Sequence, residues 1–120
     1  MNSPLRIALI GAGIMGQQHY RHLKTLTEAT LCAVVDPGPQ AATLAAEWGV
    51  AYFADHAQML EQTKPDAVIV ANPNNLHVST ALDCLAVGVA VLLEKPVGVH
   101  LDEVRRLVEA SKATGVPVLV

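Results

Sequence analysis

The sequence is poor in aromatic residues: only four of its 120 residues are Trp, Tyr or Phe. Proteins that bind single-stranded nucleic acid stack bases on aromatic rings, so this scarcity argues against that class. The formal net charge is −3 and no basic run occurs, which gives no electrostatic reason to expect DNA, RNA or an anionic membrane as a partner. Every apolar run is shorter than the about 20 residues that a membrane span needs. We therefore expect no nucleic acid and no membrane partner.

Cysteine is also scarce. Cys32 and Cys84 lie far apart in apolar surroundings, and no CxxC or HExxH motif occurs. Neither thiol has a basic partner nearby in sequence, as a cysteine nucleophile requires. This pattern predicts two buried, reduced thiols in a cytoplasmic protein and no metal site.

Apolar residues, by contrast, make up 52% of the chain, enough for the core of one domain. The apolar, largely β-branched runs are RIALI (6–10), TLCAVVD (30–36), AYF (51–53), DAVIVA (66–71), AVLLE (90–94) and VPVLV (116–120). Strands that are apolar throughout and alternate with helices predict an α/β fold with a parallel sheet. The last run ends the sequence, so we expect residues 1–120 to be one domain cut from a larger protein.

Helical spacing separates these runs. Three stretches repeat at i, i+3 or i+4, and i+7, and so predict the inner faces of three helices. Their residues are Gly16, His19, Tyr20, Leu23 and Leu26; Val78, Ala81, Leu82 and Leu85; and Leu101, Val104 and Val108.

The motif GAGIMG joins the first strand to the first helix. In that context, Gly11 permits a tight turn, Gly13 lets the backbone approach a pyrophosphate, and Gly16 lets the helix pack close to the strand. We include Ile14 and Met15 in the same candidate cofactor-binding turn. It predicts a Rossmann-type, doubly wound sheet, mainly parallel and in three layers. A glycine-rich turn that binds nothing remains the alternative.

Asp36 ends the second predicted strand, 25 positions after Gly11. A carboxylate there accepts hydrogen bonds from the hydroxyls of an adenosine ribose and repels a 2′-phosphate. No Arg or Lys lies nearby in sequence to bind such a phosphate, so the residue favours NAD over NADP. The sequence DPGP also suits a helix N-cap followed by proline, and one Asp could serve both purposes.

Two further strands end in polar motifs, ANPNNLH (71–77) and LLEKP (92–96). In a doubly wound sheet the carboxyl ends of the strands flank one ligand crevice, where the strand order reverses. Both motifs are therefore expected beside the glycine turn.

The combination of GAGIMG, Asp36, ANPNNLH and EKP resembles the N-terminal domain of the glucose–fructose oxidoreductase / inositol dehydrogenase / MocA family. The resemblance covers essentially all 120 residues. It implies an NAD(P)-dependent oxidoreductase that transfers hydride between nicotinamide and a small hydroxylated substrate such as a sugar or cyclitol. It also implies a C-terminal domain that carries most of the substrate site and is absent from this chain. We expect the full-length enzyme to be a homo-oligomer, and the fragment alone to be inactive.

The resemblance also assigns roles to residues. His77 would lie near the nicotinamide end, Glu94 would contact the nicotinamide ribose, and Lys95 would reach the substrate hydroxyl. The remaining cofactor-lining residues would be Ala71, Asn72, Pro73 and Asn74. Asn72 departs from the Ser or Thr that is usual in the motif, which leaves its contact open.

Lys95 is the candidate catalytic residue, because an ammonium near a reacting oxygen stabilises a developing alkoxide or polarises a carbonyl. In relatives a His from the second domain, with Asp nearby, is the principal base, so Lys95 would assist and position. Two alternatives stay open: Lys95 is a solvent-exposed loop residue, or Glu94 merely pairs with it. Pro96 is a candidate for a cis peptide bond.

The other histidines carry less information. His19 is expected to pack near the first strand, whereas His22, His56 and His100 are expected on the surface or in loops. Two other functions remain possible: a non-catalytic NAD(P)-binding sensor, which would have no need for Lys95, and a methyltransferase-type sheet that binds S-adenosylmethionine. The Glu-Lys-Pro motif weighs against both.

Overall fold

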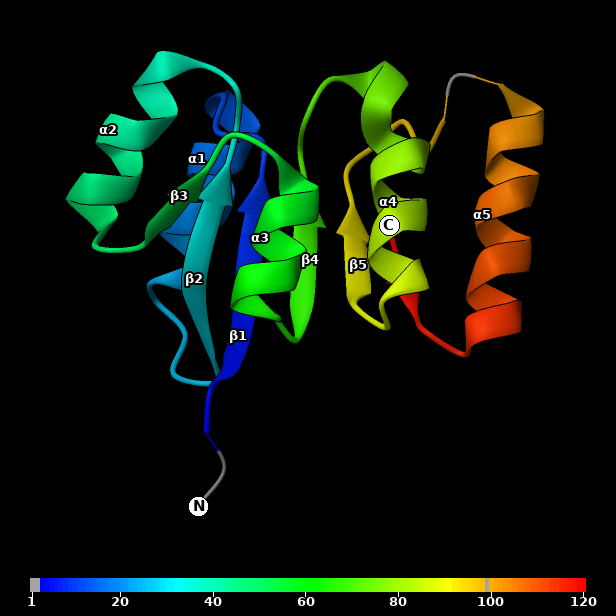
Figure 1. Ribbon diagram of the computed structural model, residues 1–120, viewed down its shortest axis with the longest axis horizontal. Coiled ribbons are helices and arrows are strands. Elements are labelled where there is room, and N and C mark those ends of the chain that lie inside the picture. Colours follow the sequence, from blue (N-terminus) through cyan, green and yellow to red (C-terminus); the bar gives the residue numbers. More distant parts are fainter. Residues whose placement is uncertain (1–2, 99) are drawn as a thin grey trace.

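Strands and helices alternate along the chain in the computed structural model, which describes residues 3–98 and 100–120 (Figure 1). The strands are β1 (Leu5–Ile10), β2 (Ala29–Val35), β3 (Ala51–Phe53), β4 (Ala67–Val70), β5 (Ala90–Leu93) and β6 (Val118–Leu119). The helices are α1 (Ile14–Leu23), α2 (Pro39–Trp48), α3 (His56–Thr63), α4 (His77–Ala86) and α5 (Leu101–Thr114), with a 3₁₀ turn, η1 (Asn74–Leu76), before α4. The predicted order of elements is confirmed.

The strands form one sheet in the order β3-β2-β1-β4-β5-β6, and every pair is parallel. Helices α1 and α2 lie on one face, while α3, α4 and α5 lie on the other (Figure 1). This is the predicted three-layer, Rossmann-type α/β fold. Strand order reverses between β1 and β4, which places the expected ligand crevice at their carboxyl ends.

The larger core lies between the sheet and α3, α4 and α5. Its helical residues include Met59 of α3, Leu85 of α4 and Leu107 of α5, each no more than 3% exposed. Smaller clusters pack α2 on Val34 and α1 on Leu9. Gly16, in the first turn of α1, lets the helix approach the end of β1 closely, because a side chain there would collide with the Gly11 carbonyl.

The predicted inner face of α4 is confirmed, since Val78, Ala81 and Leu85 are buried. The predicted face of α5 is wrong: Leu101 is 63% and Val108 46% exposed, whereas Leu107 is 3% exposed. Helix α5 carries two apolar stripes that share Val104, and helical spacing alone does not say which one meets the sheet.

The predicted inner face of the first helix extended too far toward the C-terminus. Helix α1 ends at Leu23, so Leu26 lies beyond it and is 46% exposed.

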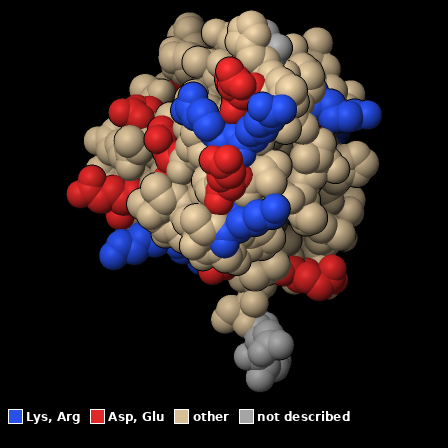
Figure 2. All heavy atoms as spheres, turned by 90° about the vertical axis from the view of Figure 1, so that its right-hand side faces the viewer, with Lys and Arg blue, Asp and Glu red and all other residues tan. Residues whose placement is uncertain are grey.

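The outer face of α5 is charged. Basic and acidic side chains are intermixed on the surface seen in Figure 2, so this side of the molecule has no large patch of positive or negative charge. Within residues 3–98 and 100–120, no helix is long and apolar enough to cross a membrane.

Candidate functional site

Four of the predicted site residues follow directly after a strand and extend the hydrogen-bonded ladder by one step. Each donates its backbone N–H to a carbonyl of the neighbouring strand, at 2.7 to 3.1 Å. The pairs are Gly11 to Val35, Asp36 to Phe53, Ala71 to Ile10 and Glu94 to Val70. The ladder therefore brings segments from the whole length of the chain to one edge of the sheet.

The glycine turn has the geometry that its motif predicts. Gly11 has φ +105°, in the region that favours glycine, and a Cβ there would collide with the Ala71 carbonyl. A Cβ on Gly16 would collide with the Gly11 carbonyl, so this glycine allows the close approach of α1. A Cβ on Gly13, by contrast, would meet no atom of the described chain within 4 Å beyond its own neighbours. The space beside Gly13 is therefore open.

The N-terminus of α1 faces this open space. Its N-cap, Gly13, makes no side-chain hydrogen bond, and the first turn holds no acidic residue. Such a helix start offers N–H groups and a partial positive charge to an anion. Ile14 is 79% and Met15 47% exposed, so both are accessible beside the turn.

Asp36 fastens the turn to the end of β2. Its Oδ2 accepts a hydrogen bond from the N–H of Ala12 at 2.8 Å, and its Oδ1 accepts one from the N–H of Gly38 at 2.7 Å. The N-cap of α2 is Gly38, followed by Pro39, so Asp36 is not the helix cap that DPGP also allowed. The carboxylate is half-buried and lies at the edge of a cavity.

This cavity has a volume of about 410 Å³ and lies at the carboxyl ends of β1, β2, β3 and β4. Its walls include Gly11, Asp36, Asn72 and Pro73, all predicted from the sequence. A larger cavity of about 630 Å³ lies between α3 and the end of α4 and contains none of the predicted residues. Because ligands of doubly wound sheets bind where strand order reverses, we assign the site to the smaller cavity.

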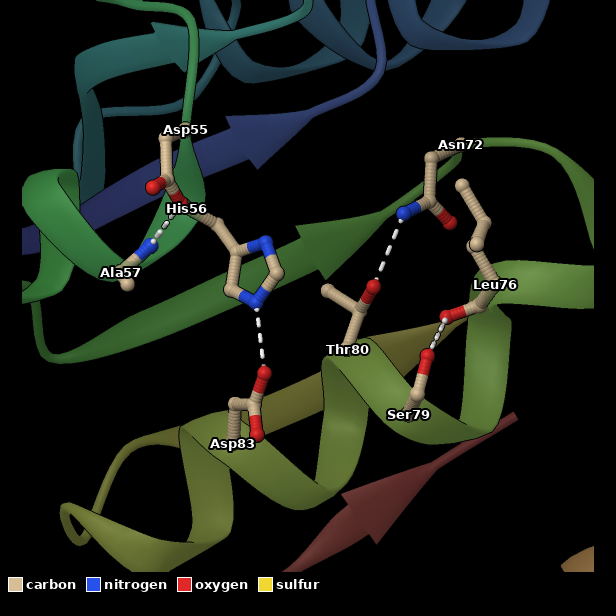
Figure 3. A network of polar contacts seen from close by, with 8 residues as sticks. All are labelled: Asp55, His56, Ala57, Asn72, Leu76, Ser79, Thr80 and Asp83. Carbon is tan, nitrogen blue, oxygen red and sulfur yellow. Dashed lines mark hydrogen bonds and ion pairs between the residues drawn. The ribbon is translucent and has the colours of Figure 1, made fainter.

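Asn72 connects β4 to α4 within this wall. Its Nδ2 donates to Thr80 Oγ1 at 3.0 Å, as Figure 3 shows. Within the described part of the chain, its Oδ1 is buried and has no hydrogen-bond partner. Pro73 and Asn74 are exposed, and Ala71 is half-buried.

Sequence reasoning missed several residues of the cavity wall. Asp55 and His56 follow β3, and Ser79 and Thr80 lie in the first turns of α4. His56 is not a loop residue but the first residue of α3, and its Nε2 lies 2.8 Å from Oδ2 of Asp83 (Figure 3). The available signal was the end of the weak strand AYF, which is one more carboxyl end on the same edge.

The Glu-Lys-Pro segment leaves β5 on the other side of the reversal point. Glu94 Oε1 pairs with Nε2 of His19 on α1, a partner 75 positions away, rather than with Lys95. Lys95 is exposed at the sheet edge, and the Lys95–Pro96 peptide bond is cis, as predicted for Pro96.

His77 lies beneath this surface and not in it. Its side chain is 1% exposed, with Nδ1 2.8 Å from the Pro96 carbonyl and Nε2 2.8 Å from the Asn72 carbonyl. A ring with both nitrogens occupied offers no polar atom to a ligand. The structure thus separates His77 from the residues that border the cleft.

The two cysteines are free; Cys84 is buried as predicted, whereas Cys32 is only partly buried. Burial raises the pKa of Cys84 to about 12 and also raises the pKa of Cys32, so little thiolate forms at neutral pH. Among residues 3–98 and 100–120, no three His, Cys, Asp or Glu side chains are arranged to hold a metal ion.

Comparison with known proteins agrees with the Rossmann-type fold described above. Residues 5–120 match the family model described as "Oxidoreductase family, NAD-binding Rossmann fold". The chain is 36% identical to D-glucoside 3-dehydrogenase of Escherichia coli over 117 residues, which are 95% of this chain and 33% of that protein. It is 35% identical to inositol 2-dehydrogenase 4 of Saccharopolyspora erythraea, again over 117 residues, covering 95% and 35%.

Among solved structures, the chain is similar to the WlbA dehydrogenase from Bordetella pertussis in complex with NADH and UDP-GlcNAcA. The TM-score is 0.93 at 28% sequence identity, over 98% of this chain and 37% of that one. The chain thus spans about a third of the length of its curated relatives.

Proposed function

Because this chain belongs to the glucose–fructose oxidoreductase / inositol dehydrogenase / MocA family and has its NAD-binding Rossmann fold, we propose that it is the cofactor-binding domain of an NAD-dependent sugar or cyclitol dehydrogenase. The relatives named above act on a glucoside and on inositol, which are both polyhydroxylated rings. Since the chain spans about a third of their length, we propose substrate binding and turnover for the full-length protein and not for these 120 residues.

One observation carries this proposal: an open glycine turn and a carboxylate meet where the strand order reverses. Nothing in the described chain fills the space beside Gly13, and the start of α1 has N–H groups but no acidic residue to oppose a pyrophosphate. Asp36 lies within hydrogen-bonding distance of the same turn. These residues fit a dinucleotide, which Gly11, Gly13, Ile14, Met15 and Asp36 would hold at its adenosine and phosphate end.

Asp36 further supports NAD as the preferred cofactor. Both of its oxygens already accept backbone N–H groups, which keeps the charge in place at the end of β2. An adenosine ribose would share this carboxylate through its hydroxyls, whereas a 2′-phosphate would meet a like charge.

The second half of the site is the edge formed by ANPN and EKP. Ala71, Asn72, Pro73 and Asn74 would line the cofactor, and Glu94 would accept a hydrogen bond from the second ribose. When bound, the cofactor supplies the hydride acceptor. Lys95, exposed beside Glu94, would place an ammonium at the substrate hydroxyl, hold it in position and stabilise charge on its oxygen as the proton leaves.

We place the principal proton acceptor in a part of the full-length protein outside these 120 residues. The two cysteines are free, as expected of a protein in a reducing compartment such as the cytoplasm. A homo-oligomeric full-length enzyme remains a prediction from the family resemblance, and light scattering would test it.

Steady-state kinetics of the full-length protein test the proposal, with NAD⁺ and a panel of cyclitols and glycosides. Lys95→Met should lower kcat by roughly 10²- to 10³-fold, the effect of removing one group that stabilises charge on the reacting oxygen, while NADH affinity changes little. Lys112→Met, on the outer face of α5, is the matched control. Residues 1–120 alone should turn over no polyol.

Three results would contradict parts of this proposal. Turnover by residues 1–120 would remove the need for a second domain. Cofactor binding without turnover of any substrate would favour a sensor. A Lys95→Met enzyme with unchanged kcat would remove Lys95 from the chemistry.

A further inference from the structure

The segment that carries Lys95 is held from two sides by histidines of two different helices. His19 of α1 pairs with the carboxylate of Glu94, and His77 of α4 contacts the carbonyl of Pro96. Lys95 lies between these two anchored residues and is itself exposed. Neither histidine was expected from the sequence to act in this way.

We propose that His19 and His77 are positioning residues: they fix Glu94 and Pro96, and thereby set where Glu94 and Lys95 stand at the carboxyl edge of the sheet. The inference rests on the proposed function, because it is toward the nicotinamide half of the dinucleotide that these two side chains would act. It adds a contact between the glycine-turn helix and the Glu-Lys-Pro segment, two parts of the site that the motifs treat separately.

The pair between His19 and Glu94 fixes the carboxylate without consuming it. The Nε2 of His19 engages Oε1 of Glu94, and a carboxylate has about four lone-pair positions on two oxygens. Oε2 therefore stays available to a ribose hydroxyl. The two side chains are 20% and 25% exposed, and a pair this accessible to water contributes little to stability. Its effect is on orientation.

His77 ties together the two motifs that border the cleft. Its side chain is 1% exposed, and its ring nitrogens each lie 2.8 Å from a backbone carbonyl, one from Asn72 and one from Pro96. Carbonyl oxygens only accept, so a neutral ring donates to one of them and an imidazolium donates to both. Only the imidazolium therefore hydrogen-bonds both carbonyls, whereas the neutral ring packs between the end of β4 and the segment after β5 and hydrogen-bonds one of them.

The competing explanation is that both histidines only stabilise the fold. The two explanations differ in which ligand is affected. A misplaced Glu94 weakens binding of the nicotinamide half and leaves the adenosine half untouched, whereas a damaged fold weakens both. ADP, which lacks the second ribose and the nicotinamide, reports on the adenosine half alone.

The experiment compares His19→Ala and His19→Gln with the control His22→Ala, an exposed histidine on the same helix. NADH and ADP affinities are measured by calorimetry on the 120-residue chain. Hydrogen exchange of residues 92–98 is measured without any ligand. His77→Asn, which keeps one donor, is carried through the same measurements.

We expect His19→Ala to weaken NADH roughly tenfold, as for the loss of one hydrogen bond to a charged group, and to leave ADP affinity unchanged. Exchange at the Glu94 amide, which donates to Val70, should accelerate, and His19→Gln should restore part of both effects because its amide can still donate to Glu94. His22→Ala should match the wild type in every measurement.

Two outcomes would overturn the positioning role. One is equal loss of NADH and ADP together with a lower melting temperature, which assigns His19 to the fold alone. The other is an exchange rate at Glu94 that matches His22→Ala. If the wild type binds neither NADH nor ADP, the proposed function fails, and the exchange measurement on His19→Ala still decides whether His19 holds the segment. Exchange of residues 92–98 in His77→Asn should also be faster than in the wild type, and an unchanged exchange rate there would remove His77 from the positioning role.

Discussion

The three glycines of the turn have three different physical requirements. Gly11 and Gly16 are demanded by the protein itself, since a side chain at either would collide with backbone. Gly13 is not, because a Cβ there would meet open space. A glycine that the fold does not need is explained by a ligand that approaches its backbone.

Gly13→Ala should therefore separate binding from folding. We expect an unchanged melting temperature to within a few degrees and a loss of NADH affinity of roughly tenfold or more, as when one charge-assisted hydrogen bond is broken. Gly49→Ala is the converse control: Gly49 has φ +70° at the end of α2, so alanine there should lower stability by about 1 kcal/mol and leave NADH binding intact. Calorimetric titration and thermal melting measure both. Unchanged NADH affinity in Gly13→Ala would contradict the pyrophosphate assignment.

Asp36 is the residue at which cofactor preference is decided. Asp36→Asn removes the charge and keeps one acceptor oxygen, which can serve one of the two backbone N–H groups, that of Ala12 or that of Gly38. NADH affinity should fall roughly tenfold, while NADPH affinity should hold or improve because the like charge is gone. Parallel titrations with the two reduced cofactors measure the ratio. An equal loss of affinity for NADH and NADPH would indicate that Asp36 only holds the glycine turn in place.

Residue-level contacts across the site were the hardest to predict. Glu94 has Lys95 beside it in sequence, yet it pairs with His19, 75 positions away. The fold brings α1 next to the end of β5, and no local pattern records that proximity. The same holds for His77, whose buried contacts with two carbonyls depend on how the ends of β4 and β5 lie.

At the scale of elements, the sequence predicted what each segment is better than which way it faces. Every strand run became a strand, because β-branched apolar runs bounded by Gly, Pro and polar residues are strong signals. The sequence predicted a helix at the position of α5, but it predicted the wrong face of that helix as the buried one. Its two apolar stripes are equally regular, and only the neighbouring elements of the folded protein, chiefly α4, decide that Leu107 faces the larger core.

The orientation of α5 is open to a direct test. Leu107→Ala should cost about 2–5 kcal/mol, because Leu107 is 3% exposed and its loss leaves a cavity in the larger core. Val108→Ala, at 46% exposure, should cost less than about 1 kcal/mol. Urea denaturation of both variants measures the difference. Similar costs, or a larger one for Val108→Ala, would restore the face that the sequence suggested.

At the scale of the whole molecule, the sheet explains why so few motifs were sufficient to locate the site. Parallel strands with helical crossovers all end on one edge, so polar residues just after strands gather there whatever their distance in sequence. Gly11, Asp36, Ala71 and Glu94 satisfy this rule and were predicted from it or from the family resemblance. Asp55, after the short strand β3, satisfies it too and was missed because that strand is weak.

Titration of the wild-type chain with NADH tests the central claim, that this edge of the sheet is a dinucleotide site. Calorimetry should show saturable binding with a Kd between about 1 µM and 1 mM, the range in which enzymes bind their substrates. NADPH should bind more weakly. A chain that melts cooperatively yet gives no heat with either cofactor at millimolar concentration would keep the fold and contradict the function.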